Sequence, residues 1–353
     1  MKRSMFLFVG VLLVVGTLLF AGGAKETSTT SSDVKIGMIL GVGGLGDLSY
    51  NDLVYAGLDR AQKELGIDFD YVEPQSIADF ETFLQQMAST RMYDVIISVG
   101  YDQVEPLKKV APQFPNQKFA IIDENVALPN VASFVSKEEE GSFLVGALAG
   151  MVKKTDLVKA NNTIGFISAL DIPLLDRFYA GYEAGARYVN PDIKVIANYV
   201  GGNAPFSDIT TAKEIALKQF SQGADIIYHA AGGSGLGLFQ AAKEKGFYAI
   251  GVNSNQNVID PDHIVASMLK RVDNAAYVIA ESLVNGNLAT GGLSVLGLAS
   301  DGIGYTVAES NVAVGPEILA VVEKIKEAIV SGELVVPDAH KDVASFLASN
   351  SFR

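Results

Sequence analysis

Two glycine-rich turns precede the residues of this sequence that are best placed for chemistry. The first turn, residues 41–46 (Gly-Val-Gly-Gly-Leu-Gly), follows an apolar run of strand length and leads into Asp47, Tyr50 and Asn51. Its Gly-x-Gly-x-x-Gly spacing matches the dinucleotide-binding fingerprint. Asp47 argues against a dinucleotide, because a pyrophosphate needs bare amides at the helix start. The same arrangement also forms the mouth of a pocket for a small solute, with Asp47, Tyr50 and Asn51 as contacts.

The second glycine-rich turn, residues 232–237 (Gly-Gly-Ser-Gly-Leu-Gly), occupies the corresponding place in the second half of the chain. It also follows an apolar strand and precedes a helical pattern. It lacks the Gly-Lys-Ser/Thr ending of a phosphate-binding loop, and Ser234 has no Gly-x-Ser-x-Gly elbow around it. Neither nucleotide hydrolysis nor a serine nucleophile is therefore indicated.

Polar and aromatic residues stand at further positions that a pocket could use. Asp123 closes the apolar run 119–122, and Asn253 closes a run in the second half. Side chains at the carboxyl ends of parallel strands point into the crevice between elements, although Asp123 could equally cap the next segment. Phe206 lies in a polar loop, where its alternative role is a small core contact. Tyr50 and Phe206, one from each half, could enclose a flat ring between them.

The sequence gives no sign of a catalytic or metal centre. Its three histidines, His229, His263 and His340, are far apart, and His229 sits in an apolar strand as a predicted core residue. The absence of cysteine excludes disulfides, thiolate metal sites, a cysteine nucleophile and a lipid-modified N-terminal cysteine. We therefore expect no cofactor, no metal and no lipid anchor.

Composition limits the class of partner. The 353 residues, 49% of them hydrophobic, suffice for two α/β domains. With 27 Lys and Arg against 40 Asp and Glu, the net charge of −13 makes nucleic acid and anionic membrane surfaces poor partners. We expect a monomer that binds a small molecule.

The first 33 residues are predicted to lie outside the fold. Residues 1–24 carry a basic head, an apolar run and the small residues Ala21-Gly22-Gly23-Ala24, the pattern of a cleaved signal peptide. The alternative is a transmembrane anchor, for which the apolar run is somewhat short. Residues 25–33 are a Ser/Thr-rich tether without an apolar pattern, which predicts disorder. The protein is therefore expected to be exported to the periplasm or cell envelope.

From residue 34 onward, apolar runs of strand length alternate with helical patterns, which is typical of βαβ units. The pattern restarts near residue 137, so we predict two similar α/β lobes. The first comprises residues 34–136 and about 266–295, and the second residues 137–265 and about 296–340.

Several segments, in order, resemble the basic membrane protein family of ABC-transporter binding proteins, which includes purine-nucleoside receptors. Residues 47–51 (Asp-Leu-Ser-Tyr-Asn) are similar to the family's Asp-Lys-Ser-Phe-Asn signature. Five further segments match in the same order and extend the resemblance over nearly the whole chain after the leader: 119–123 (Phe-Ala-Ile-Ile-Asp), 137–144 (Lys-Glu-Glu-Glu-Gly-Ser-Phe-Leu), 231–237 (Ala-Gly-Gly-Ser-Gly-Leu-Gly), 267–272 (Ser-Met-Leu-Lys-Arg-Val) and 331–337 (Ser-Gly-Glu-Leu-Val-Val-Pro).

The resemblance implies a type I periplasmic-binding fold, with two doubly wound lobes joined by three crossovers. It also implies a nucleoside held in the cleft by hinge closure and delivered to a permease and its ATPase. Carried over by motif, Tyr50 and Phe206 would stack on the base and Asp123 would read it. The sugar would face Lys270 and the backbone of Gly232 and Gly233.

Two departures from the family pattern concern the ligand. The lysine and phenylalanine of the signature are Leu48 and Tyr50 here. The acids of the family's Gly-Val-Asp-x-Asp-Gln segment are Asn253 and Asn255. An amide accepts a weaker hydrogen bond from a ribose hydroxyl than a carboxylate does. Another flat or sugar-bearing solute, such as riboflavin, and an exported nucleoside-acting enzyme are therefore the alternatives.

Overall fold

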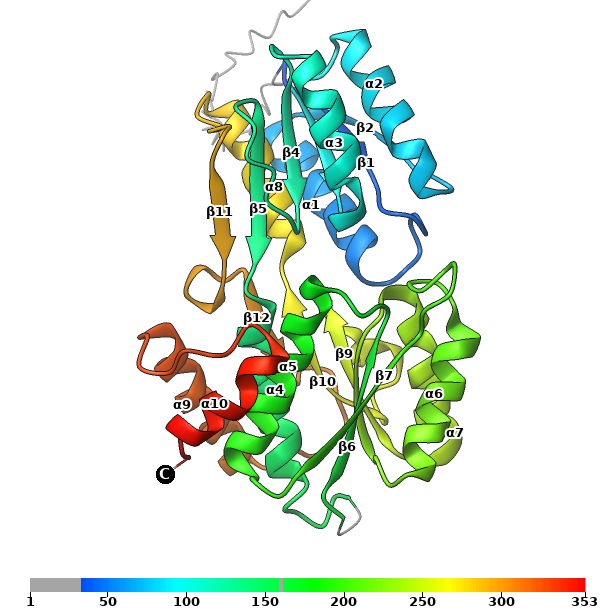
Figure 1. Ribbon diagram of the computed structural model, residues 1–353, viewed down its shortest axis with the longest axis vertical. Helices are drawn as coiled ribbons and strands as arrows, with labels where there is room; N and C mark the ends of the chain where they lie inside the picture. Colours follow the sequence, from blue (N-terminus) through cyan, green and yellow to red (C-terminus); the bar gives the residue numbers. More distant parts are fainter. Residues whose placement is uncertain (1–32, 159–160, 353) are drawn as a thin grey trace, which may run out of the picture.

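The computed structural model describes residues 33–158 and 161–352, which form two α/β lobes that lie end to end along the longest axis (Figure 1). The predicted signal peptide, residues 1–24, and nearly all of the predicted tether lie outside the described residues. Among the helices of residues 33–158 and 161–352, none is long and apolar enough to cross a membrane.

The first lobe is built on a six-stranded, fully parallel sheet with the order β11-β5-β4-β3-β1-β2. Helices α1 and α8 cover one face, and α2 and α3 cover the other (Figure 1). The strands are β1 (Lys35–Ile39), β2 (Asp68–Val72), β3 (Val95–Val99), β4 (Lys118–Ile122), β5 (Val131–Ser136) and β11 (Leu293–Leu296). The helices are α1 (Tyr50–Leu65), α2 (Phe80–Thr90), α3 (Val104–Val110) and α8 (Val272–Val284).

The second lobe repeats this plan with the strand order β12-β10-β9-β8-β6-β7, in which only β12 runs antiparallel to its neighbour. The strands are β6 (Thr163–Ser168), β7 (Lys194–Tyr199), β8 (Ile226–Ala230), β9 (Tyr248–Asn253), β10 (Ile264–Lys270) and β12 (Ile303–Thr306). The helices are α4 (Glu138–Val152), α5 (Pro173–Val189), α6 (Ile209–Ser221), α7 (Leu236–Lys245), α9 (Pro316–Val330) and α10 (Val343–Ser349).

The chain passes between the lobes three times: from β5 into α4, from β10 into α8, and from β11 to β12. The sequence predicts that the chain returns to the first lobe near residue 266. This boundary is wrong, because all of β10, up to Lys270, pairs with β9 and β12 in the second sheet. The alternation of strands and helices cannot show which sheet a strand joins. Glu140 links two of these connections, since its carboxylate accepts the Leu298 amide at 2.8 Å.

Strand order fixes where a ligand can lie. In the first sheet, β2 is added on one side of β1, and β3 is added on the other side. In the second sheet, β7 and β8 flank β6 in the same way, so the strand order switches direction between β1 and β3 and between β6 and β8. Ligands of open α/β sheets bind outside the carboxyl ends of the strands at such switch points. The turns after β1 and β8, which hold the two glycine-rich segments, therefore belong to the candidate site.

Candidate functional site

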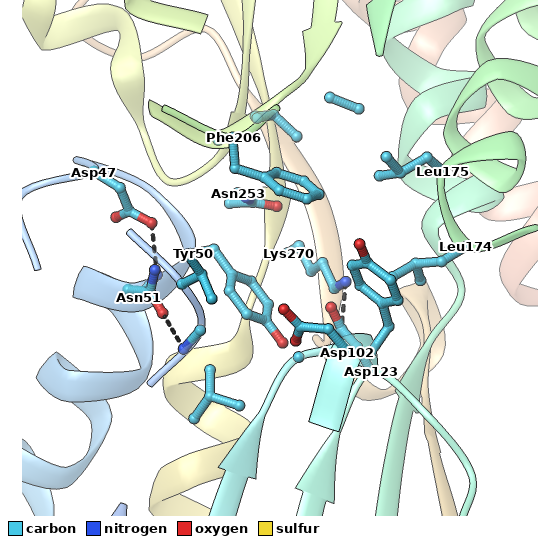
Figure 2. A pocket seen from close by; sticks show the side chains of 18 of the residues that line it. Asp47, Tyr50, Asn51, Asp102, Asp123, Leu174, Leu175, Phe206, Asn253 and Lys270 are labelled. Atoms are coloured by element: carbon cyan, nitrogen blue, oxygen red, sulfur yellow. Dashed lines mark hydrogen bonds and ion pairs between the residues drawn. The ribbon is translucent and has the colours of Figure 1, made fainter. Parts of the chain in front are cut away.

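A pocket opens between the two lobes, at the carboxyl ends of both sheets (Figure 2). About 700 Å³ of this space is not filled by atoms, part of it open to solvent, which is within the range of small-molecule sites. It is lined by Gly41, Val42, Asp47, Tyr50, Asn51, Val99, Gly100, Tyr101, Asp102, Asp123, Leu174, Leu175, Phe178, Phe206, Ala230, Gly232, Val252, Asn253 and Lys270.

Eight of the nine residues predicted to contact a ligand line this one pocket. The exception is Gly233, which lies behind the wall. A β-carbon there would stand 3.2 Å from the Phe206 carbonyl and 3.7 Å from the Asp47 β-carbon. Gly233 therefore keeps space between two lining residues of opposite lobes. The eight that line the pocket are Asp47, Tyr50, Asn51, Asp123, Phe206, Gly232, Asn253 and Lys270.

The amides of the first glycine turn are already bonded to carboxylates. Asp52 accepts the amides of Gly46 and Leu48, at 2.8 and 2.9 Å, and Glu73 accepts the Leu45 amide at 2.8 Å. A dinucleotide pyrophosphate would need such amides bare. The geometry therefore argues against the dinucleotide interpretation of the Gly-x-Gly-x-x-Gly spacing.

Asp47 and Asn51 hold the entrance of α1 in shape. The Asp47 carboxylate accepts the amides of Ser49 and Asn51 at 2.9 and 2.8 Å, and so caps the helix. Burial raises the pKa of Asp47, while these amide bonds oppose the rise. Asn51, which lines the pocket, accepts the Gly41 amide at 3.0 Å through Oδ1 (Figure 2).

A buried ion-pair network forms the floor of the pocket. Lys270 Nζ lies 2.7 Å from Asp123 Oδ1 and 2.9 Å from Glu138 Oε1, and Arg177 lies 3.3 Å from the other Glu138 oxygen. Burial alone would lower the pKa of Lys270, but the two carboxylates outweigh it and raise the pKa. Burial raises the pKa of Glu138 against the pull of Lys270. The network joins the first sheet, the first connection and the end of β10.

The two predicted aromatics approach the pocket from opposite lobes. Tyr50 projects from α1, and Phe206 from the loop after β7, both toward the space between the lobes (Figure 2). Phe206 lies 6.3 Å from the ring of Tyr101, centre to centre, and also packs against the second core. The Tyr50 hydroxyl is buried and has no hydrogen-bond partner among the residues that the structure describes.

Hydrogen bonds cross the cleft beside the pocket. Asn253 donates to Ser49 Oγ at 2.9 Å, and Ser254 and Gln256 donate to the Leu48 carbonyl at 2.9 and 3.2 Å. Leu48 and Asn253 both have positive φ, at 49° and 67°, which non-glycine residues rarely adopt. The Asn253 Oδ1 atom is buried and finds no partner among the described residues. The two segments therefore hold the lobes together at this edge.

His229 supports this crossing and takes no part in the pocket lining. Its Nε2 lies 3.1 Å from Gln256 Oε1, which also accepts the Val252 amide at 2.8 Å. Full burial lowers the pKa of His229 to about 4, so the ring is neutral at pH 7. His229 lies in β8 as a core residue, as the sequence predicts.

Sequence reasoning missed one group of lining residues that it could have found. Tyr101 and Asp102 follow β3 in the way that Asp123 follows β4, so the rule applied to Asp123 covers them too. It also missed Leu174, Leu175 and Phe178, which the first turns of α5 present to the pocket. Their helical spacing is the same as that of core residues, so no sequence signal separates them.

Within residues 33–158 and 161–352, no group of three or more histidine, aspartate or glutamate side chains could hold a metal ion. The pocket offers aromatic faces, one lysine and several carboxylates or amides. Such a set can form both ring contacts and hydrogen bonds with a small molecule that lies between the lobes.

Residues 34–340 match the family described as ABC transporter substrate-binding protein PnrA-like. The chain belongs to this family. It is 36% identical over 310 residues to an uncharacterized lipoprotein of Pyrococcus abyssi, covering 84% of this chain and 75% of the relative. It is 29% identical over 347 residues to basic membrane protein A of Borreliella burgdorferi, covering 96% and 97%. An ABC-transporter solute-binding protein of Aeropyrum pernix superposes with a TM-score of 0.79 at 32% identity, covering 90% and 98%.

The PnrA-like family membership confirms the resemblance, the type I periplasmic-binding architecture and the function class. The protein is the substrate-binding component of an ABC transporter, which takes a small molecule and works with a permease and an ATPase. Its family and structural neighbours are solute-binding proteins and not enzymes.

The predicted lack of a lipid anchor is wrong. The Pyrococcus abyssi relative and two further Pyrococcus relatives are named lipoproteins, which indicates lipid-anchored proteins of the cell envelope. Export agrees with these names. The prediction relied on the absence of cysteine from this sequence, and the names of these relatives contradict it.

Proposed function

We propose that this PnrA-like protein binds a purine nucleoside between its lobes and delivers it to the permease. The observation that carries the proposal is that Tyr50 and Phe206 come from opposite lobes to line one pocket, with Asp123 and Lys270 beside them (Figure 2). Flat bases stack on such rings with offset parallel faces. The charged pair supplies the polar contacts that fix orientation.

The polar groups divide between the two ends of a nucleoside. Asp123, on the first lobe, accepts hydrogen bonds from the base. Lys270, the Gly232 backbone and the buried Asn253 Oδ1 face the sugar hydroxyls. Asn253 is neutral where the family pattern has an acid, so its contact with the ribose is weaker than a charge-assisted bond. Stacking and the base contacts then supply a larger share of the affinity.

Binding favours closure because the ligand contacts both lobes only when the cleft is shut. The hydrogen bonds from Asn253, Ser254 and Gln256 to the 48–49 segment form in the same closed arrangement. The bound nucleoside and these hydrogen bonds therefore both stabilise the closed state.

Calorimetric titration of the unliganded protein with inosine, guanosine, adenosine and riboflavin tests the proposal. We expect at least one nucleoside to bind with one-to-one stoichiometry in the micromolar range or tighter, and to be recovered unaltered. Binding of riboflavin alone, or of none of the four, would overturn the nucleoside assignment.

Phe206→Ala is expected to weaken nucleoside binding by about 1–3 kcal/mol, the usual effect of removing a base-stacking aromatic. The matched control is Phe114→Ala, which removes a partly buried ring from the core beneath α2 and α3 without touching the pocket. Calorimetry gives the dissociation constants of both variants and so shows whether Phe206 contacts the nucleoside. Equal affinity for the wild type and Phe206→Ala would remove Phe206 from the site.

The hydrogen bond from Asn253 to Ser49 is expected to stabilise the closed state. Ser49→Ala leaves the Asn253 amide group without this acceptor, and we expect nucleoside affinity to fall by about 0.5–1.5 kcal/mol. Small-angle scattering of the unliganded variant should show a more open average shape than the wild type. An identical scattering profile and affinity would show that the crossing bonds do not contribute to closure.

A further inference from the structure

Asp102 lines the pocket together with Asp123. It follows β3, whose last residue Val99 pairs in register with Ile122 of β4, the residue before Asp123. Gly100 turns the chain between them with a φ of 114°. Two carboxylates thus stand at the ends of neighbouring strands and face the same pocket (Figure 2).

The other charges of the pocket already have partners. Lys270 is matched by Asp123 and Glu138, at 2.7 and 2.9 Å, and Glu138 also meets Arg177. Asp47 is bonded to the first amides of α1. The hydrogen bonds of the described residues include no donor for the Asp102 carboxylate other than its own backbone amide. Asp102 is therefore a second carboxylate beside Asp123 that can accept a hydrogen bond from a ligand, and no side chain of the described residues competes for it.

The surroundings of Asp102 shield it partly from water. The Tyr50 ring of α1 and the Tyr101 side chain lie close enough for the Asp102 charge to raise the pKa of both phenols, after burial, which is the larger cause. Burial raises the pKa of Asp102 itself to about 6. At neutral pH the side chain is thus mostly ionised in a partly desolvated place, where a hydrogen-bond donor from a ligand stabilises it.

We propose that Asp102 is a specificity-determining contact that accepts a hydrogen bond from an N–H group on the base of the bound nucleoside. This inference rests on the proposed function and narrows it to bases that carry an N–H donor, as the bases of inosine, guanosine and adenosine do. An uncharged base without such a donor leaves the carboxylate unpaired, and an anionic group near it is repelled.

The inference predicts a pH dependence of affinity. A ligand that donates to the carboxylate binds the ionised form better, so protons compete with it. With a pKa of about 6 in the unliganded protein, lowering the pH from about 7.5 to 5 should weaken inosine binding by about tenfold. The other ionisable groups that face this place are Tyr50 of α1, Tyr101, Asp47, Asp123 after β4, Lys270 of β10 and Glu138 of α4.

The test is a set of calorimetric titrations at several pH values. Wild type with inosine should lose affinity by about tenfold toward pH 5. Wild type with purine riboside, whose base has no N–H group, should show no such loss. Asp102→Asn with inosine should bind more weakly at pH 7.5 and show a flat profile. The control is Asp192→Asn, which changes an exposed aspartate of the second lobe. Its inosine affinity should have the same pH dependence as that of the wild type.

A wild-type inosine profile that is flat from pH 7.5 to 5 would overturn the inference without using any variant. So would a tenfold loss that persists in Asp102→Asn, or one that purine riboside shows equally. Failure of every nucleoside to bind the wild type at pH 7.5 would instead overturn the proposed function. The two failures are therefore distinguishable in one set of measurements.

Discussion

Lys270→Met is expected to abolish nucleoside binding and to lower the free energy of unfolding by about 3–5 kcal/mol at pH 7.5, the usual cost of leaving a buried charge without its partner. The substitution keeps an unbranched, similar-sized side chain but removes the ammonium. Asp123 and Glu138 then stand buried in one place, with Arg177 as the nearest remaining cation. Chemical denaturation with and without inosine measures both effects.

The loss of stability in Lys270→Met should shrink as the pH falls. Without the ammonium, the attraction of Lys270 no longer opposes the effect of burial, so the pKa of the Glu138 carboxyl rises further above its ordinary value. A carboxyl whose pKa is raised by folding destabilises the native state above that pKa and ceases to do so when it is protonated. The difference from the wild type should therefore be smaller at pH 5 than at pH 7.5.

The control for this prediction is Lys109→Met, which breaks an ion pair with Glu81 whose lysine is 64% exposed. Surface pairs of this kind contribute about 0–1 kcal/mol. Lys109→Met should therefore retain wild-type binding and nearly wild-type stability. If Lys270→Met behaved like this control, the network would have no role in the fold or the site.

Gly181→Ala is expected to lower the free energy of unfolding by about 1–3 kcal/mol and to weaken nucleoside binding. Gly181 lies on α5 against α4, where an added β-carbon would overlap the carbonyl oxygen of Glu139 and stand 2.8 Å from its α-carbon. The facing atoms are backbone, so the two helices must separate. Because α5 carries Leu174 and Phe178, its displacement moves one wall of the pocket.

Gly292→Ala serves as the control for this second prediction, since a β-carbon there meets nothing within 4 Å. Its stability should stay within about 0.5 kcal/mol of the wild type. Denaturation and calorimetry on the two variants separate a packing effect from a general effect of replacing glycine. A Gly181→Ala protein with wild-type stability and affinity would show that the close approach of α4 and α5 is not needed.

Most of the fold follows from patterns that are visible in the sequence. The apolar positions that recur every three or four residues before Gly66 form α1 (Tyr50–Leu65), and the run at residues 194–199 forms β7 (Lys194–Tyr199). Apolar periodicity and a glycine stop determine such elements locally. The sheet to which β10 belongs depends on pairing with β9 and β12, which lie elsewhere in the chain.

The candidate site was predictable where its residues follow a strand, and not where it depends on partners. Asp123 and Asn253 could be placed from the strands that they end. The acidic start of α4 predicts only a favourable helix dipole, whereas Glu138 is fully buried between Lys270 and Arg177. These two partners are remote in sequence, so no local sequence pattern predicts the buried ion-pair network. The capping role of Asp47 likewise depends on how the turn folds back on α1.

A crystal structure of the protein grown with inosine tests the central claim most directly. The account predicts one nucleoside between the lobes, with its base between the Tyr50 and Phe206 rings and its ribose toward Lys270. Density for inosine outside the cleft, or a shut cleft in which these two rings contact each other and leave no room for a base, would contradict it.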